Sequence, residues 1–183
     1  LEDSSPLARL WDIDVIDRHG NLLSRADFNF PPRPCLVCSE NAKNCARSRK
    51  HHLDEIFAEM QKRVQAVDFA DQIAELAYAA LLSEARLSPK PGLVDSINNG
   101  SHKDMNLHTF EQSALALKPF FSIFVLEGMK TAEDPSSQIL RQIRPLGLQA
   151  EQAMLQATEQ VNTHKGAIFA FGLVCTAIGR LYQ

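Results

Sequence analysis

The sequence predicts a mainly α-helical protein, with a helical bundle over residues 53–183 and a small β-hairpin in a loop-rich segment before it. From residue 53 onward, apolar residues recur at spacings of three and four, which is the period of an amphipathic helix. Before that point the main regular signal is one short alternation of apolar and acidic residues. The stretch FPPRPC then excludes regular structure, because proline lacks an N–H donor and holds the preceding residue extended. We expect two domains, over residues 1–52 and 53–183.

The first expected element is a strand in LWDIDVI, followed by the turn DRHGN. The alternation places Trp11, Ile13 and Val15 on one face and Asp12 and Asp14 on the other. Two carboxylates on one side of a strand can hold Mg2+ against a di- or triphosphate. The alternative is that both aspartates are solvated residues on the wet face of the hairpin.

The helices follow in order along the rest of the chain. The first begins at Leu53 and becomes more apolar toward its end, and a Phe-rich helix over about 108–129 has Pro119 as its expected kink. Another is expected over about 145–158. The last is AIFAFGLVCTAIG, which is apolar all round, and its Gly172 and Gly179 lie two turns apart, a spacing that suits close packing.

Composition bounds the classes of function. The chain has 183 residues, 45% of them hydrophobic, and a formal net charge of -3. That charge gives no overall attraction to nucleic acid or to an anionic membrane, so we expect neither partner. No charged and apolar signal segment opens the sequence and no apolar run is long enough to span a bilayer, so we expect a cytoplasmic protein.

A first polar interruption, RLSPKPGLVDSINNGSHKDM, lies between two helices that are expected to be buried. Lysine can neutralise phosphate, aspartate and histidine can act as bases or metal ligands, and the two glycines permit tight turns. The alternative is a long surface loop in which asparagine and aspartate form turns. The candidate residues here are Lys90, Asp95, Asn98, His102 and Asp104.

A second polar interruption, VNTHKG, comes just before the last helix. Its candidate residues are Asn162, His164 and Lys165. Thr163 can cap the helix, and the free N–H groups of a first helical turn suit a phosphate or a carboxylate. Two such loops joined to buried helices favour a shared pocket.

Three cysteines crowd into CLVCSENAKNC and two histidines follow. Cys35, Cys38, Cys45 and His51 can supply four ligands to zinc, because thiolates and imidazole suit tetrahedral coordination. The alternative is a loop with reduced thiols. A zinc-stabilised binding or interaction module without catalysis is therefore an alternative function.

The two polar stretches, together with FEQSALALKPFF, resemble the triphosphoribosyl-dephospho-coenzyme A synthase family over about residues 68–183. Over about residues 7–52, ARLWDIDVI and CLVCSENAKNCARSRKH resemble the apo-citrate lyase phosphoribosyl-dephospho-coenzyme A transferase family. Their order resembles that of a fused bifunctional protein that makes and attaches the prosthetic group of citrate lyase. By this resemblance the chain is an internal fragment of such a fusion.

The resemblance implies a transferase with ATP and 3′-dephospho-coenzyme A as substrates and Mg2+ as cofactor. The 2′-hydroxyl of dephospho-coenzyme A displaces adenine from C1′ of ATP, which requires a base, a donor to adenine and counter-charge for the triphosphate. We expect these roles to fall as follows: Asp95 or Asp104 as base or Mg2+ ligand, His102 at the departing adenine or a phosphate, Lys90, His164 and Lys165 on the triphosphate, and Asn98 and Asn162 on ribose hydroxyls.

In the second reaction that the resemblance implies, a serine of the citrate lyase acyl carrier protein displaces diphosphate in a nucleotidyl-type transfer. Asp12 and Asp14 would then hold Mg2+. Helices as apolar as residues 167–178 need covering partners, so self-association is a further expectation.

Overall fold

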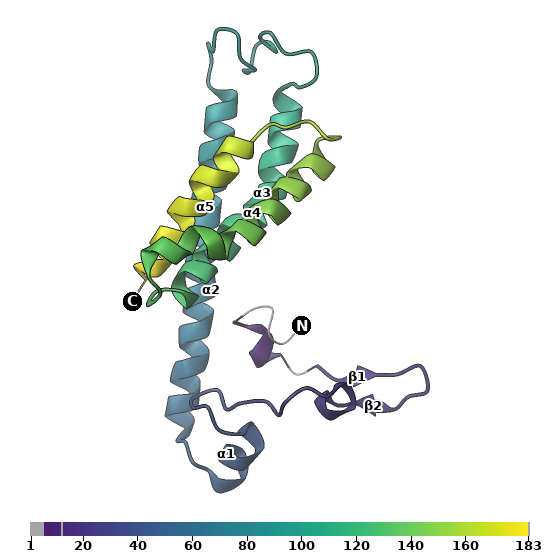
Figure 1. Cartoon of the computed structure of the whole chain (residues 1–183), viewed down its shortest axis with the longest axis vertical. Helices are drawn as coiled ribbons and strands as arrows, with labels where there is room; N and C mark the ends of the chain where they lie inside the picture. Colours follow the sequence, from purple (N-terminus) through teal and green to yellow (C-terminus); the bar gives the residue numbers. More distant parts are fainter. Residues whose placement is uncertain (1–5, 12, 183) are drawn as a thin grey trace. The chain divides into compact units, whose positions relative to one another are not determined.

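The computed structural model describes residues 6–11 and 13–182, and the chain divides into two compact units between Val67 and Asp68. Helix α2, Leu53–Arg86, contributes residues to both units (Figure 1). Within the described ranges, none of the helices combines the length and the apolar composition that crossing a membrane requires.

The first unit is poor in regular structure, as predicted. Strands β1, Val15–Ile16, and β2, Leu22–Leu23, form an antiparallel hairpin. The turn depends on Asp17, whose carboxylate accepts N–H bonds from His19 at 2.7 Å and Asn21 at 2.9 Å. The remaining elements are the 3₁₀ helices η1, Ala8–Leu10, and η2, Arg25–Phe28, and helix α1, Ala42–Ser48.

The first unit also has very little apolar core. Among its described residues, only Ala8 and Cys45 are buried hydrophobic side chains. The strand predicted over LWDIDVI is shorter than expected, since only its last two residues pair with β2. Trp11, Ile13 and Val15 are each about half exposed.

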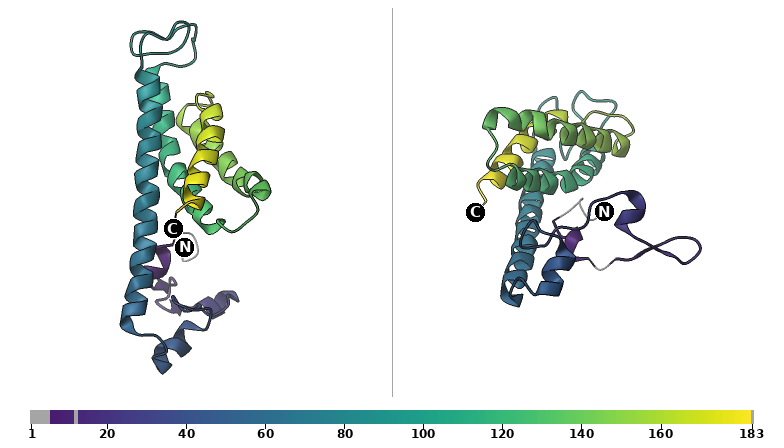
Figure 2. Two further views of the ribbon diagram at one scale, coloured as in Figure 1. Left: turned by 90° about the vertical axis from the view of Figure 1, so that its left-hand side faces the viewer. Right: turned by 60° about the horizontal axis from the view of Figure 1, so that its bottom comes forward.

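The second unit is the predicted helical bundle. The C-terminal part of α2 shares one apolar core with α3, Leu107–Lys130, α4, Ser136–Ala157, and α5, Lys165–Arg180 (Figure 2). Polar contacts join the facing surfaces of α2 and α3: Ser122 donates to Asp71 at 2.8 Å, and Arg86 pairs with Glu111 at 2.6 Å. The largest fully buried side chains of this core are Leu117, Phe121, Phe124 and Met154.

One helix prediction needs correction, and a proline explains it. Helix α4 begins at Ser136, well before the expected start near residue 145, and contains Pro145, whereas helix α3 was expected to contain Pro119 and does. The start signal of α4 is Pro135, whose φ of -57° suits a helix entry. Both internal prolines are exposed, so the carbonyls that lose an N–H partner face solvent instead of the core.

Helices α3 and α5 run parallel and touch through their backbones. Pairs along the interface advance in the same direction on both helices: Ser113 with His164, Phe121 with Phe171, Phe124 with Gly172, and Gly128 with Thr176. A Cβ atom at Gly128 would overlap the carbonyl of Thr176, and one at Gly179 would overlap the carbonyl of Val125. The predicted close packing at Gly172 and Gly179 is therefore confirmed, with Gly128 as the matching residue on α3.

We expect Gly179→Ala to destabilise the second unit by about 1 to 3 kcal/mol, because the added methyl group forces two backbones apart. Gly147→Ala is the matched control, since no atom lies within 4 Å of a Cβ at that helical position. Helix propensity predicts a gain of up to about 1 kcal/mol for the control. Urea unfolding followed by circular dichroism measures both changes, and equal midpoints for the two variants would contradict the packing argument.

Candidate functional site

The polar loop over residues 87–106 is organised around the buried carboxylate of Asp95, which is 4% exposed. One oxygen accepts the N–H groups of Ile97 and Asn98, both at 2.8 Å, and the other accepts from the Lys90 N–H at 3.1 Å and the Ser88 hydroxyl at 3.0 Å. The Asn98 amide, followed by those of Lys90 and Ile97, holds the pKa of this carboxyl well below its usual range. Both oxygens of Asp95 are thus occupied by the loop itself.

Two glycines allow the same loop to fold back on itself. Gly92 and Gly100 both have positive φ, and a Cβ at Gly100 would overlap the backbone of Gly92. Ser101 fixes this crossing, because its N–H and its hydroxyl both donate to the Gly92 carbonyl, at 3.2 and 2.8 Å. The predicted role of the glycines in tight turns is confirmed.

The second polar loop, residues 158–164, ends in a buried hydrogen-bond chain. The Thr163 hydroxyl donates to Ser113 of α3 at 2.7 Å, and Ser113 Oγ lies 2.7 Å from His164 Nδ1. Thr163 was expected to cap α5, and it does not. The N-cap is His164 without a side-chain bond, and the Asn162 side chain accepts the Lys165 N–H at 3.3 Å.

Ser113 occupies one nitrogen of the His164 ring. The Ser113 hydroxyl accepts from Thr163 and lies within hydrogen-bond distance of Nδ1, so Nδ1 has a partner inside the protein. Nε2 is buried and has no hydrogen-bond partner. Burial lowers the pKa of His164 to about 4, which keeps the ring neutral at neutral pH.

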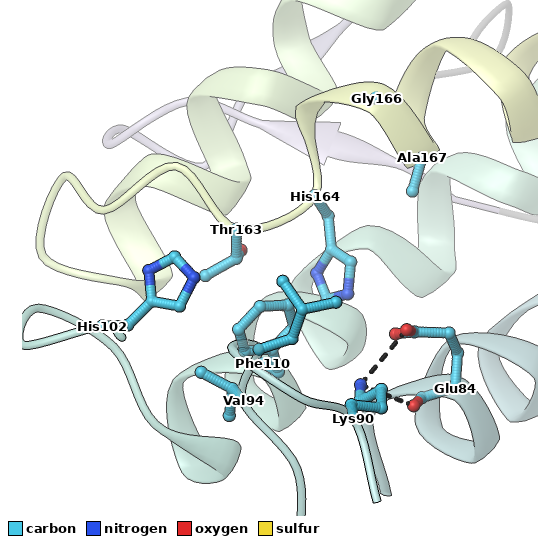
Figure 3. Close-up of a pocket in the computed structure, with 10 residues that line it drawn as sticks. Glu84, Lys90, Val94, His102, Phe110, Thr163, His164, Gly166 and Ala167 are labelled. Atoms are coloured by element: carbon cyan, nitrogen blue, oxygen red, sulfur yellow. Dashed lines mark hydrogen bonds and ion pairs between the residues drawn. The ribbon is translucent and has the colours of Figure 1, made fainter. Parts of the chain in front are cut away.

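The two loops meet at one pocket of about 290 Å³ in the second unit. It is lined from the first loop by Lys90 and His102 and from the second by Thr163 and His164 (Figure 3). Phe110 of α3 packs edge-on against the His164 ring, with centroids 5.1 Å apart. The predicted meeting of the two polar loops is therefore observed.

Lys90 supplies the positive charge of this pocket. Its ammonium group donates to the Glu84 backbone carbonyl at 2.8 Å and to the Glu84 carboxylate at 3.1 Å. The lysine side chain is only 11% exposed, whereas the glutamate side chain is 59% exposed. Figure 3 shows this pair on the wall that the His164 ring faces.

The predicted residues separate into three groups. Lys90, His102 and His164 line the pocket, and Asp95 supports it from within the loop. Asp104 lies beside the lining, with one oxygen 3.8 Å from His102 Nδ1. The pocket lining does not include Asn98, Asn162 or Lys165. The Asn98 side chain accepts the Gly100 N–H, and Lys165 pairs with Glu151 at 2.6 Å.

Two residues of the site were not predicted. Ser113 was detectable in principle, because it is a polar residue within the apolar stripe of a helix that also contains Phe110, Ala114 and Leu117. Glu84 carries no such signal, since it lies among other polar residues near the end of α2.

The first unit holds a separate cluster of possible metal ligands. One ligand atom from each of Cys35, Cys38, Cys45 and His51 lies within 4.8 Å of all the others. The four predicted residues are thus brought together, and this set can hold a metal ion. Asp14 is exposed just before β1, and Asp12 lies outside the described residues.

Comparison with known proteins agrees with both resemblances. The family model described as CitG, ATP:dephospho-CoA triphosphoribosyl transferase, matches residues 70–183. The chain belongs to the CitG family. The model described as CitX, apo-citrate lyase phosphoribosyl-dephospho-CoA transferase, matches residues 1–67, so the two families occur in the predicted order.

Several similar proteins are longer than this chain. "Protein CitXG" of Haemophilus influenzae is 68% identical over 181 residues, covering 99% of this chain and 39% of that protein. The "2-(5''-triphosphoribosyl)-3'-dephosphocoenzyme-A synthase" of Haemophilus ducreyi is 68% identical over 147 residues, or 80% of this chain and 46% of the relative. "Protein CitXG" of Leuconostoc mesenteroides subsp. cremoris is 36% identical over 193 residues, covering 100% of this chain and 41% of the relative.

The chain spans less than half the length of these curated relatives. No solved structure matches it.

The buried imidazole of this CitG-family pocket predicts a pH-dependent stability. His164 is neutral in the fold down to about pH 4 but titrates near its ordinary value when unfolded, so stability falls as pH drops from about 6.5 toward 4. Between pH 7.5 and 5 we expect a loss of about 1 to 2 kcal/mol that His164→Gln abolishes. Urea midpoints at both pH values measure it. His108→Gln, at an exposed position, is the control and should keep the wild-type dependence.

Because both oxygens of Asp95 accept hydrogen bonds from the first loop, we predict that Asp95→Asn loosens this loop. An amide at this position would direct an NH2 group at backbone N–H donors and leave them unpaired. We expect hydrogen exchange of the Ile97 and Asn98 amides to become at least about tenfold faster. Asp104→Asn, which changes an exposed carboxylate of the same loop, should leave these rates unchanged. Equal effects of both variants would show that Asp95 does not organise the loop.

Proposed function

We propose that this chain carries part of a transferase site that moves the triphosphoribosyl group of ATP to the 2′-hydroxyl of 3′-dephospho-coenzyme A, with release of adenine. The observation that supports this most strongly is the pocket where two polar loops meet around the unpartnered Nε2 of His164. A buried polar atom without a hydrogen-bond partner costs free energy, so we expect a ligand atom to form a hydrogen bond with Nε2. The CitG family match gives the class of ligand.

The reaction breaks the bond between C1′ of ATP and adenine and forms a bond from C1′ to the 2′-oxygen. The hydroxyl loses a proton, adenine gains one, and the triphosphate stays on the transferred ribose. Such a substitution needs anion binding, proton transfer and exclusion of water. The pocket offers a neutral N–H donor, an ammonium group and a partly exposed imidazole, which together meet the first two needs.

We assign the anion contacts to His164 and Lys90. We place the ring proton on Nε2, so that Nε2–H of His164 would donate to a phosphate or ribose oxygen while Ser113 donates to Nδ1. Lys90 would neutralise phosphate charge, and Glu84 holds its ammonium group in place until then. Lys165 remains a predicted phosphate contact from outside this pocket lining.

We assign proton transfer to His102. It lines the pocket, its side chain is 35% exposed, and Asp104 lies within ion-pair distance of Nδ1. A carboxylate beside one ring nitrogen orients the imidazole. Asp104 would thus act through His102, and Asp95, whose oxygens are both occupied, would position the loop. Asn98 and Asn162 remain predicted contacts to ribose hydroxyls.

Mg2+ would enter with the triphosphate. Among the residues that line this pocket, Glu84 is the one carboxylate, and it is paired with Lys90. Mg2+ keeps much of its water and is often held by one or two carboxylates together with substrate phosphates. Because the pocket lining has so few carboxylates, we propose that phosphate oxygens of the substrate would supply most of the Mg2+ ligands.

We also propose that the two functional domains meet within α2. The expected boundary at residues 52 and 53 marks where the helix begins, but the first core residue of the bundle is Ala70. The part before Val67 would belong to the transferase that loads a serine of the citrate lyase acyl carrier protein, with Asp12 and Asp14 as predicted Mg2+ ligands.

Ligand binding by the chain tests the proposed site. We expect saturable calorimetric binding of Mg2+·ATP and of 3′-dephospho-coenzyme A. Lys90→Met and His164→Leu should each weaken ATP binding by about tenfold or more, because each removes a donor to an anion. Lys103→Met is the control, because Lys103 is an exposed lysine of the same loop outside the pocket lining.

Chromatography of mixtures that contain both substrates measures adenine release directly. A well-folded chain that binds neither ATP nor inorganic triphosphate nor dephospho-coenzyme A would contradict the proposal. An ATP affinity lowered as much by Lys103→Met as by Lys90→Met would contradict the assignment of Lys90.

A further inference from the structure

The thiol cluster of the first unit has the dimensions of a tetrahedral metal site. Cys38 Sγ lies 3.6 Å from Cys45 Sγ and 3.3 Å from His51 Nε2. Metal–ligand bonds of about 2.3 Å to sulfur and about 2.0 Å to nitrogen, at tetrahedral angles, give sulfur–sulfur distances of about 3.8 Å and sulfur–nitrogen distances of about 3.5 Å. The observed separations are close to these values before any ion is placed.

Backbone hydrogen bonds fix the ligand positions independently of an ion. The segment before the first ligand pairs with the start of α1: Cys35 N–H donates to the Glu40 carbonyl at 2.6 Å, and Ala42 N–H donates to the Arg33 carbonyl at 2.9 Å. Cys45 lies inside α1, and its carbonyl accepts the Lys50 N–H at 3.1 Å just before His51. The fold therefore presents three sulfur atoms and one nitrogen to a common point.

The surroundings of the cluster suit metal ligation. The backbone amides of Val37 and Cys38 donate hydrogen bonds to Cys35 Sγ and hold this sulfur in place. His51 Nδ1, the nitrogen that faces away from Cys38, lies 3.9 Å from a Glu55 carboxylate oxygen. A carboxylate beside the second ring nitrogen commonly orients a metal-bound histidine.

The described part of the first unit has almost no apolar core, which favours a structural role for the thiol cluster. Ala8 and Cys45 are the two buried hydrophobic side chains among the described residues before Val67. Metal ligation is a common source of local stability where few apolar side chains are buried. Cys45 is itself one of the two, so the site lies where the core would be.

We infer that Cys35, Cys38, Cys45 and His51 bind one structural Zn2+. Three thiolates and one imidazole select zinc over Mg2+ or Mn2+, which prefer oxygen ligands. Four protein ligands complete a tetrahedral shell and leave no position for a substrate or a reactive water. The site therefore stabilises the first unit and takes no part in the transfer chemistry proposed for the second.

Metal analysis of the whole chain, prepared without a histidine tag, tests this inference. We expect about one zinc per chain by mass spectrometry of the metal content. Replacement of zinc by Co2+ should give the sulfur-to-cobalt charge-transfer band and the strong visible bands of tetrahedral coordination. Cys38→Ser and His51→Ala should lose the metal, and limited proteolysis before residue 67 should become faster.

Three further variants separate ligation from simple loss of structure. Cys175→Ser removes a buried thiol outside the cluster, and His52→Ala removes the exposed imidazole next to His51, so both should keep about one zinc. His51→Cys should also keep the metal, because it restores a fourth ligand. The inference is overturned if the wild-type chain holds well under one zinc and takes up no Co2+ with thiolate bands. A Cys38–Cys45 disulfide in unreduced protein, or zinc retained by Cys38→Ser, would overturn it as well.

Discussion

The close contact between α3 and α5 is the constraint on which the rest of residues 68–183 depends. Gly128 and Gly179 let the two backbones touch, and the successive pairs between the helices show that they run parallel. Each helix follows one polar loop, so a parallel pair brings both loops to the same end of the bundle. In an antiparallel pair the loops would be separated by roughly the length of α5, about 24 Å at 1.5 Å per residue, and no common pocket would form.

Much of this fold was predictable because local signals and tertiary packing agree. The helical period from Leu53, the proline-rich break and the turn at DRHGN all correspond to observed elements. The start of α4 was predicted wrongly because Pro145 was given too much weight. Pro145 is accommodated on an exposed helix face, and that exposure depends on how the helices pack, which the sequence pattern of one helix does not contain.

The site was predictable in its residue types and less so in its geometry. Sequence identified both polar loops and therefore Lys90, His102 and His164, but whether the loops meet depends on the parallel pairing of α3 with α5. Ser113 stands out as a polar residue in the apolar stripe of α3, but that position does not reveal His164 as its partner, and no local signal marks Glu84. The cysteine cluster was easier to predict from the sequence. Its ligands lie within one short stretch, and only a turn and one short helix need to form to bring them together.

The self-contained hydrogen bonding of Asp95 has a consequence for the entropy of ligand capture. A loop of this length would ordinarily lose much conformational freedom when it closes on a substrate, and that loss would weaken binding. Here the backbone between Ser88 and Asn98 is already restrained by one carboxylate, and the crossing of Gly92 with Gly100 restrains the remainder. The ordering has taken place during folding, so more of each contact with the proposed nucleotide ligand would be available as affinity.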